Sequence, residues 1–97
     1  SDGASVQINK GTTENMAEFI VDGAVKLYYD SARKLETTST GATVTGSIQM
    51  SDDTDTAVAG KVGTQRYRTS GNNSYVDMCM QTGASTYEWI NIVQNNW

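Results

Sequence analysis

Proline and histidine are absent from this 97-residue chain, and cysteine occurs once, at Cys79. A single cysteine forms no disulfide within the chain and has no second thiol with which to build a zinc site. The sequence also lacks a Gly-x-Ser-x-Gly elbow, a Gly-x-x-x-x-Gly-Lys phosphate loop and paired carboxylates on a defined scaffold. We therefore expect no enzyme activity, no metal site and no cofactor, and we expect Cys79 to be a small buried hydrophobic residue.

Apolar residues are also scarce. They make up 37% of the chain, and no apolar run approaches the roughly 20 residues of a membrane-spanning helix. Charged residues make up only 19% and the net charge is −4, whereas disordered chains combine low hydrophobicity with high net charge. The composition therefore favours ordered β-structure with much solvated surface.

The mild negative charge argues against a nucleic-acid partner, because phosphate binding needs a basic face. Besides the pair Arg33 and Lys34, the only local basic cluster is Lys61, Arg66 and Arg68. The chain has no initiating methionine, so we expect it to be a fragment whose missing part lies on the N-terminal side.

Apolar and polar residues alternate with a period of two, which predicts β-strands. The alternation is clearest over residues 42–50. Further strands are predicted over residues 6–8, 17–21, 25–29, 64–68, 75–81 and 87–93. Asp22-Gly23 is a strong hairpin signal, and residues 70–74 and 82–86 are predicted hairpin connections. A single helical turn over 54–59 is the most helix that the pattern supports.

The pattern divides the chain into three parts. Residues 1–50 are predicted to form a meander of short strands, residues 51–62 a joint, and residues 63–97 a C-terminal subdomain of β-hairpins. Each strand offers one or two apolar residues to an inner face, which at about 25 cal/mol per Å² contribute only several kcal/mol. Backbone ordering costs about 1 to 2 kcal/mol per residue, so we expect the deficit to be met across an interface between chains.

Two stretches resemble known proteins. Residues 25–30, 34–41 and 44–46 resemble a repeat in the fibres of tailed bacteriophages, especially marine and cyanobacterial phages, although an acidic residue is common there in place of Lys26. Asparagine or glycine is likewise common near Ser31-Ala32. Residues 63–67, 75–80 and 87–92 are similar to the terminal pattern of tail-fibre proteins, in which a Gly-Thr-x-Arg-aromatic strand precedes a last strand bearing tryptophan.

The resemblance implies an all-β fold in which short-strand meanders and hairpins assemble as an intertwined homotrimeric fibre module. Residues 1–50 would be the shaft-like repeat region and residues 63–97 the distal tip. The implied partners are further copies of the chain, other virion tail proteins and a host cell-surface glycan or protein. The implied location is the virion tail fibre, after synthesis in the host cytoplasm.

Two sets of residues follow as candidates. Loops on a rigid scaffold carry recognition, so the receptor-contact candidates lie in or beside the predicted loops of the tip. They are Asn72, Asn73, Ser85, Thr86 and Tyr87. The candidates for packing in the core or between chains are Val25, Leu27, Tyr29, Val44, Ile48, Trp89, Ile90 and Ile92.

Other interpretations stay open at this stage. Most of the aromatic residues could pack within strands or across chain contacts instead of stacking on sugars. Asp52, Asp53 and Asp55 could hold calcium, but they lack the spacing, central glycine and terminal glutamate of an EF-hand loop, which favours a solvated acidic loop. The whole chain could be a purely architectural part of a virion, or a monomeric carbohydrate-binding β-sandwich.

Overall fold

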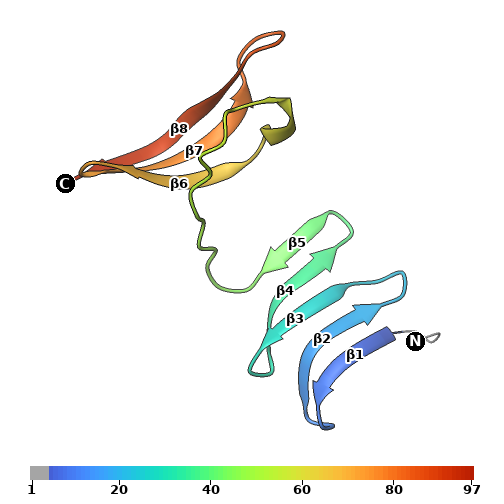
Figure 1. Cartoon of the computed structure of the whole chain (residues 1–97). Helices are drawn as coiled ribbons and strands as arrows, with labels where there is room; N and C mark the ends of the chain where they lie inside the picture. The colour runs from blue at the N-terminus through green and yellow to red at the C-terminus, as the bar shows by residue number, and fades with distance from the viewer. Residues whose placement is uncertain (1–4) are drawn as a thin grey trace. The chain divides into compact units, whose positions relative to one another are not determined.

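A computed structural model describes residues 5–97, so the first four residues of the predicted meander lie outside the described part of the chain. The fold is all-β, as predicted, and the chain divides into two compact units, Ser1–Ile48 and Gln49–Trp97 (Figure 1). Strands of the first unit are β1 (Ser5–Lys10), β2 (Glu14–Ile20), β3 (Val25–Tyr29), β4 (Ala32–Thr38) and β5 (Gly41–Val44). The second unit contains the 3-10 helix η1 (Ala59–Lys61) and strands β6 (Gln65–Ser70), β7 (Asn73–Gln81) and β8 (Tyr87–Asn96).

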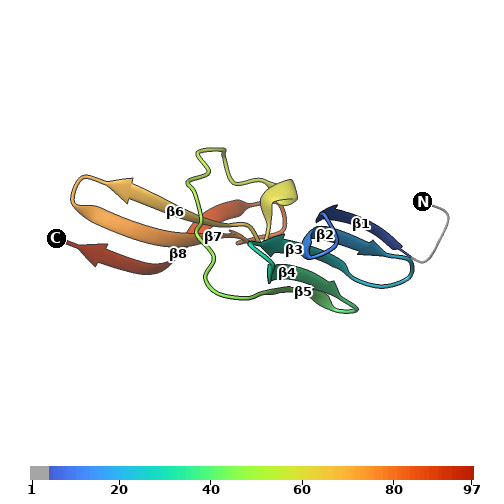
Figure 2. The same ribbon diagram turned by 90° about the horizontal axis from the view of Figure 1, so that it is seen from below.

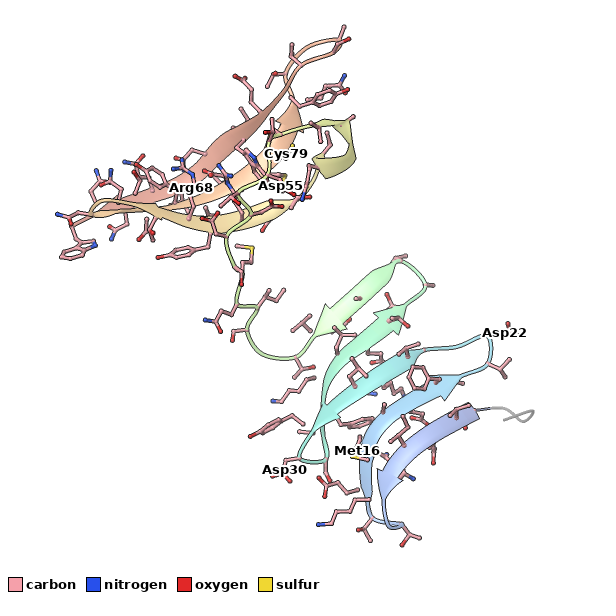
Figure 3. The ribbon with its side chains drawn as sticks, viewed as in Figure 1. Met16, Asp22, Asp30, Asp55, Arg68 and Cys79 are labelled. Atoms are coloured by element: carbon pink, nitrogen blue, oxygen red, sulfur yellow. The ribbon has the colours of Figure 1, made fainter. Side chains whose placement is uncertain are left out.

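The first unit is one antiparallel sheet in which each strand pairs with the next along the chain, in the order β1-β2-β3-β4-β5. Its β2–β3 and β3–β4 turns use the left-handed backbone region, with φ of 53° at Asp22, 47° at Asp30 and 66° at Ser31. Aspartate tolerates this region better than most residues. Asp22 and Asp30 mark opposite ends of this sheet (Figure 3).

The register of the first sheet sorts side chains cleanly between its two faces. Cross-strand partners share a face, and Ile8, Ala17, Leu27, Leu35 and Val44 pair successively across all five strands. The neighbouring row is polar and lies on the opposite face. It consists of Gln7, Glu18, Lys26, Glu36 and Thr43.

The second unit is a three-stranded antiparallel sheet, β6-β7-β8, with the preceding segment laid across one face (Figure 2). The Ser51 carbonyl accepts the Tyr67 amide at 3.3 Å, and the Gly63 amide donates to the Cys79 carbonyl at 2.8 Å. Residues 51–62, expected as a joint, therefore pack within this unit. Cys79 is fully buried, as predicted, and so is Asp77.

Three local predictions differ from the structure. The strand expected over 42–50 ends at Val44, because Gly46 turns the chain with a φ of 110° and residues 45–58 form no regular element. Ile48 consequently lies outside any strand and is 71% exposed. Strand β4 was missed because its polar residues hide the alternation, and the helical turn expected over 54–59 lies instead at η1, overlapping only at Ala59.

Candidate functional site

The first sheet has an apolar face that none of residues 5–48 covers. We call it the first apolar face; it consists of Val6, Ile8, Ala17, Phe19, Val25, Leu27, Leu35 and Val44. Only Ala17 is buried, at 8% exposure, whereas Ile8 is 48% and Leu27 42% exposed. Large side chains that stay this exposed on one continuous surface are typical of interaction sites.

The opposite face carries charged residues that are better sheltered. We call Gln7, Glu18, Lys26, Glu36 and Thr43 the polar row. Gln7 Nε2 donates to Glu18 at 2.9 Å, and Lys26 Nζ lies 3.9 Å from Glu18 Oε1. The side chains of Glu18 and Lys26 are only 17% and 21% exposed. Glu18 and Lys26 are therefore less exposed than Ile8 and Leu27 on the opposite face.

The covered face of the second sheet is organised around a buried carboxylate. Asp77 is completely buried in β7, and its Oδ2 accepts hydrogen bonds from Arg66 Nε at 2.9 Å and from Arg68 Nε. Its Oδ1 accepts from Asn91 Nδ2 at 3.3 Å. Burial alone would raise the pKa of Asp77, but the hydrogen bonds from Arg68, Arg66 and Asn91 outweigh it and lower the pKa below its ordinary value.

Aromatic rings and the covering segment close this polar core. The Arg66 guanidinium lies 4.0 Å above the Trp89 ring, and Arg68 lies 3.8 Å above the Tyr75 ring. The Trp89 indole N–H donates to the Asp55 carbonyl at 3.0 Å, which ties Trp89 to the covering segment. Figure 3 shows Arg68, Asp55 and Cys79 together in this unit.

The third cation of the second unit is also paired. Lys61 Nζ lies 2.8 Å from Asp53 Oδ2 and 3.0 Å from Asp55 Oδ2. The hydrogen bond from Lys61 lowers the pKa of Asp53, and the hydrogen bond to Asp53 raises the pKa of Lys61. The basic cluster seen in the sequence is thus neutralised, and residues 5–97 contain no group of side chains suited to hold a metal ion.

The second sheet has an uncovered face as well. We call it the second apolar face; it consists of Tyr67, Val76, Met78, Met80, Ile90 and Val93. Met78 pairs with Ile90, which settles the register that the sequence left open, while Ile92 lies at a bulge and is 50% exposed. A hollow of about 160 Å³ lies on this face between Tyr67, Val76 and Val93.

A shallow groove of about 760 Å³ lies beside the β7–β8 connection. One wall is Ala57, Val58 and Ala59 of the covering segment, and the other comes from residues 82 and 85–88. The connection is held in shape by its own hydrogen bonds. The Thr82 amide donates to the Thr86 carbonyl at 2.8 Å, and Gln81 Nε2 donates to the Gly83 carbonyl at 2.9 Å.

The structure separates the predicted receptor-contact residues into two groups. Ser85, Thr86 and Tyr87 line the groove, whereas Asn72 and Asn73 lie at the β6–β7 turn, at the other end of β7. Nine residues of strand span about 30 Å, so one small ligand cannot touch both groups. The Asn72 carbonyl accepts the Trp97 amide at 2.9 Å.

Sequence reasoning missed the cluster of Asp77 with Arg66 and Arg68. Arg66 and Arg68 stand two residues apart on a predicted strand, which places both on one face, and that spacing was the available signal. Asp77 interrupts the apolar residues Val76 and Met78, but its partner could not be chosen without the register.

The chain was compared with protein-family models, with curated proteins and with solved structures, and none of the three comparisons finds a match. Among residues 5–97, no helix is long and apolar enough to cross a membrane. The geometry of the chain itself is therefore the basis for a functional proposal.

Proposed function

We propose that this chain is a distal module of a bacteriophage tail fibre, assembled as a homotrimer and mediating attachment to a host surface without enzymatic activity. The observation that carries the proposal is that each unit is a single sheet with one apolar face that the described residues of that unit leave uncovered. Such a surface is stabilised by sister copies in an assembly, and closed cyclic symmetry also protects exposed strand edges.

Attachment is assigned to the groove lined by Ser85, Thr86 and Tyr87. The groove offers hydroxyl groups and an aromatic ring, which suit a sugar or a polar peptide. All three cations of residues 49–97, Lys61, Arg66 and Arg68, are engaged by aspartates of the same unit. An uncharged ligand is therefore favoured over a sulfated, phosphorylated or sialylated one.

Tight attachment would come from avidity. Three weak sites on one fibre, and several fibres on one virion, raise the overall affinity by orders of magnitude without any new contact. A single shallow groove is sufficient for this purpose, whereas it would be a poor site for a monovalent receptor.

Two measurements test the proposal. Light scattering is expected to give a mass about three times the 10.5 kDa of one chain. The purified protein is expected to compete with virions for host cells, and Tyr87→Ala is expected to weaken that competition. A folded single chain in solution would contradict the fibre assignment.

One observation favours a second candidate, a purely architectural fibre segment. The connections between the strands of each sheet are short, with two residues at the β3–β4, β4–β5 and β6–β7 turns and five at the β7–β8 connection. Recognition surfaces more often use longer loops. A trimer that fails to compete with virions at saturating concentration would favour this candidate.

A further inference from the structure

We infer that the first apolar face is the surface through which sister copies of this chain pack against one another, with the polar row turned outward. The inference rests on the proposed homotrimer and assigns its interface. It selects one sheet face out of four and names the side chains that the assembly buries.

The first apolar face is continuous across the sheet, and the charged pair Lys10 and Glu14 lies beyond it at the β1–β2 end of the same side. Its central row crosses every strand of the sheet, from Ile8 on β1 to Val44 on β5. Ile8, Phe19, Leu27 and Val44 keep between 37% and 48% of their surface exposed. Side chains that are this exposed in one chain are available for burial against another chain.

The area of the face is that of an interaction patch. Its exposed side chains present on the order of 400 Å² of apolar surface, which is the size at which patches mark interaction sites. One such face packed against another removes on the order of 800 Å², which is the size of a weak, reversible interface.

The chemistry of the face favours a copy of itself as the occupant. An uncharged apolar face needs an uncharged apolar partner, since a charged group buried against it would lose its hydration without gaining a counter-ion. The same face on a second copy meets this condition and repeats the same strand spacing. Two such sheets pack about 10 Å apart, as in β-sandwiches.

A matched pair of variants on β1 tests the assignment. Ile8 and Gln7 are adjacent and both exposed, but they lie on opposite faces. Ile8→Lys introduces a cation into the interface and is expected to lower the association constant at least tenfold in sedimentation equilibrium. Gln7→Lys places its cation opposite Glu18 and is expected to leave association unchanged. Far-UV circular dichroism of both variants reports whether the strands are retained.

A cross-linking pair keeps the test decisive if Ile8→Lys does not fold. Leu27→Cys and Lys26→Cys place thiols on opposite faces at the middle of the sheet, while the natural Cys79 is fully buried and protected from reagents. A short bismaleimide is expected to join chains of Leu27→Cys and not chains of Lys26→Cys.

The outcomes separate this inference from the proposed function. Association that both lysine variants retain, or cross-linking through Lys26→Cys alone, would overturn the face assignment and leave the fibre proposal standing. A folded wild-type monomer would overturn both. If vesicles of phosphatidylcholine captured that monomer, the face would belong to a lipid surface instead.

Discussion

Asp77 is the residue on which the second unit depends most. It is fully buried and holds two arginines that also stack on aromatic rings. Asp77→Asn keeps the shape of the side chain but leaves Arg66 and Arg68 without their counter-charge. Removing one partner of a buried ion pair costs about 3 kcal/mol.

Denaturant unfolding of the whole chain, monitored by tryptophan fluorescence, measures the free energy of unfolding that Asp77→Asn loses. Both tryptophans, Trp89 and Trp97, belong to the second unit, so the signal reports that unit alone. Glu88→Gln, which removes one exposed carboxylate, serves as the control and is expected to change the free energy of unfolding by less than about 0.5 kcal/mol. Equal effects of the two substitutions would contradict the role given to Asp77.

The same carboxylate predicts how the second unit responds to acid. The pKa of Asp77 lies below its ordinary value of 3.8 in the folded chain, so the unfolded chain binds the proton first as the pH falls. The stability that Asp77 contributes is complete above about pH 4 and is lost as the pH falls through the folded pKa. Unfolding free energies between about pH 5 and pH 2 are expected to fall less steeply in Asp77→Asn than in the wild type. If the unfolding free energies of the wild type and Asp77→Asn fell equally steeply with pH, Asp77 would not be the source of the acid sensitivity.

Residue-level features were only partly predictable from the sequence. Burial of Cys79 followed from the chemistry of that side chain alone. The grouping of Asp77, Arg66 and Arg68 did not, because it depends on which residues face each other across β6 and β7. The separation of Asn72 from Tyr87 depends likewise on strand direction, which no single residue reveals.

A single substitution in the β3–β4 turn is expected to stabilise the first unit. Both of its central residues, Asp30 and Ser31, have positive φ. This geometry is typical of a two-residue hairpin turn, which prefers glycine at the second position. Ser31→Gly is therefore expected to stabilise the hairpin by about 0.5 to 1 kcal/mol.

Amide hydrogen exchange in β3 and β4 measures this effect, with slower exchange expected in Ser31→Gly. The β4–β5 turn supplies the control, because Ser39 and Thr40 do not adopt positive φ. Thr40→Gly is expected to leave exchange unchanged or to accelerate it, since glycine there adds only freedom to the unfolded chain. Acceleration by Ser31→Gly would show that the turn geometry is wrong.

Strand existence was easier to predict than strand extent. The alternation found most strands, but β4 carries the sequence Ala-Arg-Lys-Leu-Glu-Thr-Thr and shows too few apolar residues to be detected. Residues 42–50 alternate well and are nevertheless a strand only as far as Val44. Alternation reports which side chains could share a face; whether a neighbouring strand is present to pair with them is a separate matter.

For the whole molecule, the all-β class could be predicted from composition, whereas the cover over the second sheet could not. Residues 51–62 look like a linker because they are polar and irregular, yet they accept the hydrogen bonds that close the Asp77 core. Their contribution comes largely from backbone carbonyls, which every sequence carries. For the same reason, the sequence predicted only the wall of the candidate groove that the β7–β8 connection forms. The opposite wall, Ala57 to Ala59, belongs to the covering segment.

Assembly also predicts that thermal stability depends on concentration. If folding and association are linked, the midpoint of thermal unfolding rises with protein concentration. A tenfold increase in concentration is expected to raise the wild-type midpoint by several degrees, and Ile8→Lys is expected to abolish most of that rise. A midpoint independent of concentration would show that each chain folds alone.

The most direct measurement is sedimentation equilibrium of the intact chain over a dilution series, with circular dichroism recorded on the same samples. The account predicts a species of about three times 10.5 kDa at micromolar concentration, and loss of β-structure as dilution separates the chains. A 10.5 kDa species that keeps its full β-signal at every dilution would contradict it.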